Sequence, residues 1–376
     1  MGLATRLKTE ALNLGFHLVG ITTPEPPTSV PVYESWLAEG HHGEMAYLAA
    51  PDARQRRADP REILPECQSI LVLGIHYSPP KALSLKPLQG KIAAYACNED
   101  YHEVLKLRLQ ALVAFLEREA GGSIPNRFYT DTGPVLERDL AQRAGLGWIG
   151  RNSMLINPRV GSYFLLAEIF LGIPLEPDAP FNSDHCGSCT RCVDACPTAC
   201  ILPNRTLDAR HCISYWTIEH KGATPVSLRP YQGNWVFGCD ICQQVCPWNR
   251  RFAPPVGDPA FAPRSHLPGV ELLDELVLDQ QVFNRSYKGS PIKRAKRRGY
   301  LRNVAVALGN VKDPAAIPVL AQSLLQDPEP LVRGHVAWAL GQIRGDDSVK
   351  ALKQALEQES VFEVSEEIIA ALDFLG

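Results

Sequence analysis

Residues 186–197 read Cys186-Gly-Ser-Cys189-Thr-Arg-Cys192-Val-Asp-Ala-Cys196-Pro197, and this stretch decides the fold of the middle of the chain. The spacing is that of bacterial ferredoxins with two [4Fe–4S] clusters, in which three thiolates hold one cluster and the fourth holds the other. A looser run follows, formed by Cys212 and then Cys239-x2-Cys242-x3-Cys246-Pro247. Eight of the eleven cysteines lie in these two runs, and Cys200 lies between them. The sequence therefore predicts a protein that moves single electrons.

Two four-iron clusters need eight thiolates, which fixes how the cysteines are shared. We expect the first cluster to be held by Cys186, Cys189, Cys192 and Cys246. We expect the second to be held by Cys196, Cys212, Cys239 and Cys242. Cys200 is then surplus, and we interpret it as a buried thiol.

Zinc sites and disulfides are the alternatives for these cysteines, and the spacing favours neither. Zinc takes four ligands per site and rarely uses a tight run of three thiolates followed by Cys-Pro. Disulfides form in oxidising compartments, whereas no secretory apolar segment opens this sequence. A reducing compartment is therefore expected.

Composition bounds the remaining possibilities. The chain has 376 residues, of which 45% are hydrophobic, so two or three domains with real cores are expected. The formal net charge is only −3, which gives no global field of the kind that marks many nucleic-acid binders. We see no apolar run long enough to span a membrane, no twin-arginine leader, and Arg6 where a myristoylation site needs Ser or Thr. The expectation is a cytoplasmic protein without a membrane partner.

Residues 1–180 are predicted to form an α/β domain. Leucine and alanine recur with helical spacing over 3–15, and short apolar segments over 17–21 and 69–77 are typical of buried strands. Residues 101–120 predict a long amphipathic helix with Leu105, Leu109, Leu112 and Leu116 on one face. A Gly-rich segment over 144–152 precedes two more strand-like runs. Residues 181–268 are rich in Pro and Cys and are expected to form a small ferredoxin-like domain.

The end of the chain, 284–376, contains a repeat. Val304-Ala-Val-Ala-Leu-Gly-Asn-Val311 recurs as Val336-Ala-Trp-Ala-Leu-Gly-Gln-Ile343, 32 residues later, and Ala371 begins a truncated third copy. Paired helices with this period are typical of HEAT repeats, which form a concave surface for a large partner. A plain helical cap on the catalytic domain is the alternative.

A basic run lies at the start of this repeat region, with no acid inside it. The residues that we expect to contact phosphate groups of a partner are Arg285, Lys293, Arg294, Lys296, Arg297, Arg298 and Arg302. The alternative is a solvated face, which is the usual position of a charge run. Because the run is unbalanced by acids and precedes the repeats, phosphate binding is favoured.

Several stretches together resemble the epoxyqueuosine reductase family. They are Met45-Ala-Tyr-Leu48, Arg57-Ala-Asp-Pro-Arg61, Asp100-Tyr-His102, Asp131-Thr-Gly-Pro-Val-Leu-Glu-Arg138, 144–152, Gly161-Ser-Tyr-Phe164, 212–219 and 238–247. The resemblance covers nearly the whole chain, and the combination of Asp131-Thr-Gly-Pro with the Cys212 segment is specific. Two other functions compete with it: a reductive dehalogenase, and a non-catalytic electron-transfer adaptor with a HEAT docking arm.

The resemblance implies a cobalamin-dependent enzyme that reduces epoxyqueuosine to queuosine at the wobble position of transfer RNA. Electrons would pass from an external low-potential donor through two [4Fe–4S] clusters to cobalamin, and the anticodon stem-loop would be the RNA partner. The motif Asp-x-His-x-x-Gly, which supplies an axial histidine in many cobalamin proteins, is absent. That absence fits a family that leaves cobalt without a protein histidine, and it also fits a protein without cobalamin.

Asp131 is the expected proton donor. Removing the epoxide oxygen requires a proton in the site, and a carboxylic acid supplies one at neutral pH only if burial raises its pKa. The alternative is an ordinary aspartate that caps a helix beginning near Pro134. The Gly-rich segment is expected to let backbone approach a large flat cofactor. The resemblance implies these cobalamin contacts: Arg57, Cys97, Asp131, Gly150, Asn152, Ser153, Tyr163, Ser214 and Asp240.

Overall fold

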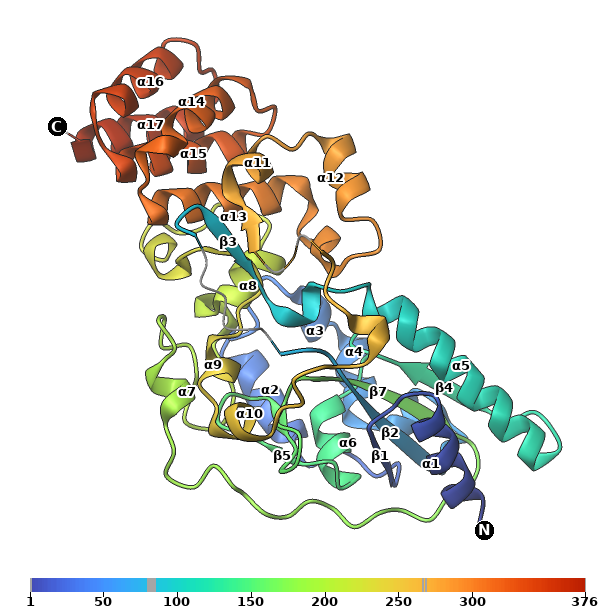
Figure 1. Cartoon of the computed structure of the whole chain (residues 1–376). Helices are drawn as coiled ribbons and strands as arrows, with labels where there is room; N and C mark the ends of the chain where they lie inside the picture. Colours follow the sequence, from blue (N-terminus) through green and yellow to red (C-terminus); the bar gives the residue numbers. More distant parts are fainter. Residues whose placement is uncertain (1, 80–85, 266, 268, 376) are drawn as a thin grey trace. The chain divides into compact units, whose positions relative to one another are not determined.

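The computed structural model describes residues 2–79, 86–265, 267 and 269–375, and these form two compact units (Figure 1). The first unit contains residues 1–79, 98–210 and 241–262. The second contains residues 80–97, 211–240 and 263–376. Both units are discontinuous, in contrast to the three consecutive domains expected from the sequence. The expected ferredoxin-like segment, 181–268, contributes to both, and its last residue lies outside the described part.

The centre of the first unit is a four-stranded sheet with the order β1-β2-β7-β4. The strands are β1 (Leu18–Thr22), β2 (Ser69–His76), β4 (Asn126–Tyr129) and β7 (Phe164–Leu171), and all neighbours run antiparallel. Every residue of β2 is buried, as the continuous apolar segment predicts.

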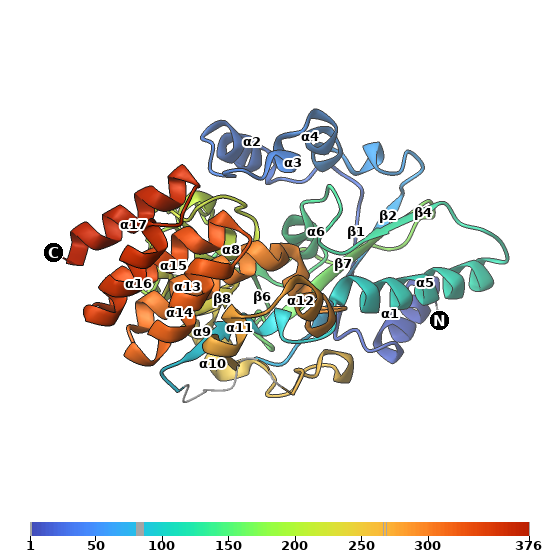
Figure 2. The ribbon, with the colours of Figure 1, turned by 90° about the horizontal axis from the view of Figure 1, so that it is seen from above.

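Helices cover both faces of this sheet. Helices α1 (Leu3–Asn13) and α5 (Tyr101–Ala120) lie on one face, and α6 (Glu137–Arg143) lies on the other (Figure 2). The ends of α5 are marked in the sequence, because the Asp100 side chain accepts from the amide of His102 and Gly121 takes the left-handed conformation that ends many helices. The four predicted core leucines of α5 are buried. Burying each of them contributes about 1.5–3 kcal/mol.

The rest of the first unit is made of short elements. Helices α2 (Val30–Ala38), α3 (Ala46–Ala49) and α4 (Pro51–Ala58) follow β1. The hairpin of β5 (Trp148–Ile149) and β6 (Leu155–Ile156) and the helices α7 (Arg191–Asp194), α9 (Ile241–Gln244) and α10 (Pro247–Phe252) surround the first cysteine run.

The second unit joins a small sheet to a helical array. The sheet has the order β8-β3-β9, from β3 (Gln89–Ile92), β8 (Trp235–Phe237) and β9 (Gly269–Glu271). Helices α8 (Ile213–Ile218), α11 (Leu272–Leu276) and α12 (Gln280–Ser286) belong to the same unit.

The repeat region forms two rows of helices. One row is α13 (Lys296–Val311), α15 (Pro330–Ile343) and α17 (Phe362–Leu375); the other is α14 (Ile317–Gln326) and α16 (Asp346–Leu356). The three copies of the sequence repeat fall on α13, α15 and α17, so the repeat predicted from the 32-residue period is confirmed. Among the described residues, no helix is both long enough and apolar enough to cross a membrane.

Candidate iron–sulfur and catalytic sites

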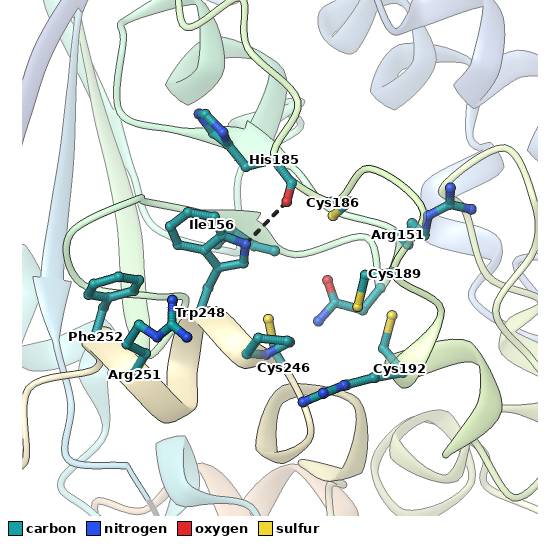
Figure 3. Close-up of a pocket in the computed structure, with 13 residues that line it drawn as sticks. Arg151, Ile156, His185, Cys186, Cys189, Cys192, Cys246, Trp248, Arg251 and Phe252 are labelled. Atoms are coloured by element: carbon teal, nitrogen blue, oxygen red, sulfur yellow. Dashed lines mark hydrogen bonds between the residues drawn. The ribbon is translucent and has the colours of Figure 1, made fainter.

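The first unit contains a thiol-lined cavity of about 200 Å³ (Figure 3). The four cysteines expected to hold the first cluster, Cys186, Cys189, Cys192 and Cys246, all line it. Cys186 and Cys189 precede α7, Cys192 lies on α7, and Cys246 precedes α10. Four thiols around one small cavity are the donor set that a [4Fe–4S] cluster requires, so these residues fit the group.

Trp248 and three arginines form other walls of this cavity. Trp248 Nε1 donates to the carbonyl of His185 at 3.3 Å (Figure 3). Behind the wall, Trp148 Nε1 donates to Cys186 Sγ at 3.4 Å. Arg151, Arg191 and Arg251 also line the cavity. Hydrogen bonds and positive charge near cluster sulfurs influence the reduction potential. The positions of these side chains beside the cavity were not predicted. The one hint in the sequence is that Trp248 directly follows Cys246-Pro247.

The second predicted set of ligands is divided between the units. Cys196 and Cys242 belong to the first, whereas Cys212 and Cys239 belong to the second. Cys200 is 5% exposed, which confirms the expected burial of the surplus thiol. Its Sγ lies 3.5 Å from Cys196 Sγ, and this contact lowers the pKa of Cys196 to about 5.

Asp131 follows the end of β4 and is held in a left-handed conformation, with φ of 60°. Tyr101 donates its hydroxyl to Asp131 Oδ2 at 2.8 Å, and His102 Nε2 lies 3.6 Å from the same oxygen. The side chain is 58% exposed, so the expectation that it is buried is wrong. The capping alternative also fails, because α6 begins at Glu137 after Leu136 and has no side-chain cap.

His102 brings a proton close to Asp131. Burial acts to lower the pKa of His102, but its hydrogen bond with Asp100 and the nearby carboxylates of Asp100 and Asp131 outweigh burial and raise it to about 9. The Nδ1 atom lies 2.7 Å from Asp100 Oδ1, and this bond lowers the pKa of Asp100. The imidazole is therefore cationic at neutral pH. Asp131 thus faces both a phenol and an imidazolium, each of which carries a proton.

Two glycines of the Gly-rich segment lie where a side chain would not fit. A Cβ atom on Gly147 would lie 2.1 Å from the carbonyl oxygen of Ile156, and one on Gly150 would lie 2.5 Å from Ile156 Cδ1. Both glycines therefore accommodate the tight hairpin of β5 and β6. The packing of the hairpin accounts for both glycines, and the expected approach of a cofactor to this segment stays a prediction.

Most of the other expected cobalamin contacts are buried and partnered within their own unit. Ser153 Oγ donates to the carbonyl of Arg205 at 2.6 Å, and Asn152 Nδ2 donates to that of Cys242 at 3.4 Å. Asp240 accepts from the amide of Ala94 at 2.7 Å. The remaining residues are Arg57, whose guanidinium lies over the Tyr33 ring, Tyr163, which packs edge-on against Tyr77, the buried Cys97, and Ser214 on α8.

Two of the expected RNA contacts are structural. Arg297 is 6% exposed and pairs with the buried Asp327, and Arg302 is fully buried, where it donates to the carbonyls of His220 and Gly222. A phosphate has no access to these guanidinium groups, so both expectations are wrong. Arg294 is exposed and pairs with Glu219. The exposed members of the run are Arg285, Lys293, Arg294, Lys296 and Arg298.

Three family models match the chain. Residues 57–132 match "Epoxyqueuosine reductase QueG, DUF1730", residues 185–249 match a 4Fe-4S double cluster binding domain, and residues 295–373 match HEAT repeats. An epoxyqueuosine reductase of Pseudomonas aeruginosa is 43% identical over 344 residues, which cover 90% of this chain and 94% of that protein. The epoxyqueuosine reductase of Escherichia coli is 39% identical, with 90% and 89% covered.

Solved structures agree with these relatives. A selenomethionine-labelled epoxyqueuosine reductase superposes with a TM-score of 0.92 at 31% identity, covering 100% of this chain and 99% of that one. An epoxyqueuosine reductase with an epoxyqueuosine-modified tRNA-Tyr stem loop gives 0.91 at 32% identity, with 99% and 98% covered. The enzyme from Bacillus subtilis, with an aspartate-bearing catalytic loop swung out of its active site, gives 0.90 at 31% identity, with 100% and 99% covered.

Proposed function

This chain belongs to the epoxyqueuosine reductase family, and we propose that it reduces epoxyqueuosine to queuosine at the wobble position of transfer RNA. The observation that carries this proposal is the Asp131 site, where an exposed carboxyl lies beside two proton-bearing groups in the same unit as the four-thiol cavity. Opening the epoxide to an alkene consumes two electrons and two protons and releases one water. The chain must therefore deliver both electrons and protons.

Electron delivery falls to the cysteines. In this proposal Cys186, Cys189, Cys192 and Cys246 hold one [4Fe–4S] cluster, and Cys196, Cys212, Cys239 and Cys242 hold the other. A bound cluster would carry one electron at a time, so one reduction would need two electrons from an external donor. Trp148 donates a hydrogen bond to the sulfur of Cys186, a proposed ligand, and Trp248 lines the cavity that the first cluster would occupy.

Proton delivery falls to Asp131. The departing epoxide oxygen becomes a hydroxyl and then water, and a positioned acid lowers the barrier to that departure. Tyr101 and the His102 imidazolium are placed to return a proton to Asp131 after each turnover. The exposed loop that carries Asp131 is also the kind of element that moves in a relative, where the catalytic loop is swung out.

The cobalamin assignment comes from the family. When bound, cobalamin would supply a low-valent cobalt centre that is a strong reductant. Its proposed neighbours are Arg57, Cys97, Asp131, Gly150, Asn152, Ser153, Tyr163, Ser214 and Asp240, of which Asn152, Ser153 and Asp240 also bond within the protein. Trp216 Nε1 is buried and has no hydrogen-bond partner among the described residues, so it is available to an acceptor on a ligand.

Transfer RNA is the proposed substrate carrier, because a relative was solved with a modified tRNA stem loop. Arg285, Lys293, Arg294, Lys296 and Arg298 present positive charge on the second unit. Their chemistry suits the phosphates of an anticodon stem, which supply most of the affinity in such complexes.

The test of the proposal is a turnover assay on the protein reconstituted anaerobically with iron, sulfide and cobalamin. With a low-potential reductant and tRNA that contains epoxyqueuosine, queuosine should accumulate, as measured by mass spectrometry of digested nucleosides. A non-catalytic electron-transfer adaptor would bind iron and give no queuosine, and that result would refute the proposal.

The ligand assignment predicts iron contents for single variants. Wild-type protein should bind about eight irons per chain. Replacing Cys246 or Cys212 with Ser should lower this to about four, because each variant removes one thiolate from one cluster. Iron analysis and electron paramagnetic resonance of anaerobic preparations measure the result.

Cys200→Ser is the matched control for this prediction. Cys200 lies 3.5 Å from a proposed ligand but is not itself assigned to a cluster, so its iron content should stay at about eight. Loss of iron in Cys200→Ser together with full iron in Cys212→Ser would contradict the assignment.

A further inference from the structure

A buried carboxyl lies in the middle of the catalytic sheet. Glu168 is 0% exposed and is paired in register with Val72 on β2 and Tyr129 on β4. Because side chains alternate along a strand, Glu168 faces the same side as Leu166 and Phe170. That side packs against α6, through residues such as Leu140. An acid in such an apolar layer is costly unless it is neutral or paired.

The neighbour of Glu168 is a second acid, Glu137, at the start of α6. Neither oxygen of Glu168 has a hydrogen-bond donor among the described residues if both carboxyls are ionised. Two carboxyls can bond to each other only when one of them carries a proton. Burial and the charge of Glu137 raise the pKa of Glu168 well above its usual range, and burial and Asp131 raise that of Glu137 to about 7.

Glu137 connects this pair to the catalytic loop. Its Oε1 accepts from the backbone amide of Asp131 at 2.6 Å. Asp131 has a φ of 60°, which is uncommon for a residue other than glycine, and contacts from its surroundings help to keep it there. The bond from Asp131 to Glu137 is such a restraint, and it acts on the backbone of the proposed proton donor itself.

We propose that Glu137 and Glu168 share one proton and that this carboxyl pair holds the Asp131 loop in place, which makes Glu137 and Glu168 positioning residues for the reaction. This inference rests on the proposed function, in which Asp131 is the proton donor whose position matters for the reaction. With the shared proton present, Glu168 hydrogen-bonds to Glu137 and fixes its carboxylate toward the Asp131 amide. Without it, two adjacent anions repel each other and the restraint weakens.

The charges around the pair determine when the proton is lost. When Asp131 on the loop is ionised it favours keeping the proton, whereas Arg138 on α6 and His102 on α5 are cations that favour losing it. Tyr129 on β4 is the other titratable neighbour in the strand pairing, and β2 contributes the apolar Val72. Asp139, the next acid on α6, points elsewhere and accepts from Thr28 and Ser29.

The sign of the pH effect follows from protons bound in each state. In the unfolded chain both glutamates lose their protons near their usual pKa. In the folded protein the pair keeps one proton to higher pH. The folded state therefore binds more protons, and stability should fall as pH rises from about 5 through about 7. In Glu168→Gln the side-chain amide can still donate to Glu137 but does not titrate. The loss of stability with rising pH should therefore be smaller in that variant than in wild type.

The first experiment measures the loop directly, by hydrogen–deuterium exchange of the reconstituted full-length protein. The peptide that contains the Asp131 amide should exchange about tenfold faster in Glu137→Ala than in wild type, because the amide has lost its acceptor. Glu137→Gln, whose amide oxygen can still accept, should restore most of the protection. Asp139→Asn is the matched control on the same helix and should leave this peptide unchanged. Equal exchange in Glu137→Ala and wild type would overturn the positioning role.

The second experiment measures the shared proton through the pH dependence of turnover. Glu168→Gln should be within about threefold of wild type at pH 6.5, and its activity should persist to higher pH than that of wild type. An unchanged alkaline limb in Glu168→Gln would overturn the shared proton. The exchange experiment needs no substrate, so a failure of the proton-donor role of Asp131 would be seen separately, as full activity of Asp131→Asn.

Discussion

Asp131→Asn should lower the turnover of epoxyqueuosine-containing tRNA by about two to four orders of magnitude, the range expected for loss of a general acid. The amide cannot deliver a proton to the departing oxygen, although it has the same size and can still accept from Tyr101. Substrate binding should change little, because the effect falls on the chemical step. Single-turnover assays on the reconstituted enzyme, with queuosine measured by mass spectrometry, separate chemistry from binding.

The interpretation of that variant depends on intact cofactor sites. Iron content, the absorption spectrum with cobalamin and the melting temperature should all match wild type. Asp52→Asn, which changes an exposed acid in the first turn of α4 in the same unit, is the matched control and should retain full turnover. Near-normal turnover of Asp131→Asn would remove Asp131 from the mechanism.

Local signals in the sequence were sufficient for several elements. Helix α5 begins and ends where it was expected, because both its first residue and its last are marked by short-range chemistry: an Asp cap and a left-handed glycine. The 32-residue repeat predicted paired helices for the same reason, since each copy carries its own apolar face. The ferredoxin spacing predicted that Cys186, Cys189 and Cys192 share a site. The need for eight thiolates in two clusters predicted Cys246 as the fourth, and all four line the first cavity.

Features that depend on contacts between residues far apart in the sequence could not be predicted from local patterns. The basic run contains Arg297, but its partner Asp327 lies 30 residues further along, and nothing within the run distinguishes Arg297 from the exposed Arg298. Glu168 stands in an apolar strand, and only the packing of α6 against the sheet shows that its neighbour is Glu137. The exposure of Asp131 likewise depends on a loop conformation that the Gly-Pro turn did not specify.

The second large effect is on the affinity for transfer RNA, and the structure limits the residues to test to the exposed members of the basic run. Replacing Lys293, Lys296 and Arg298 together with Gln should weaken tRNA binding by about a hundredfold at low salt. Each lost phosphate contact should also reduce the log–log salt slope by roughly 0.7 to 0.9. These three side chains are exposed and lie within six residues of one another, where a 3-10 turn leads into α13. Fluorescence anisotropy of a labelled anticodon stem-loop across a salt series measures both quantities.

The matched control removes the same charge from another part of the same unit. Lys312, Lys350 and Lys353 are exposed, so changing all three to Gln alters the net charge equally while leaving the start of α13 intact. Affinity and salt slope should then stay close to wild type if the effect is local. Equal losses of affinity in the two triple variants would show that only the net charge of the protein matters. An unchanged salt slope in the Lys293, Lys296 and Arg298 variant would show that the RNA binds elsewhere. Reduction of a free epoxyqueuosine nucleoside should be affected far less than that of tRNA, because the nucleoside has no phosphates for these residues to bind.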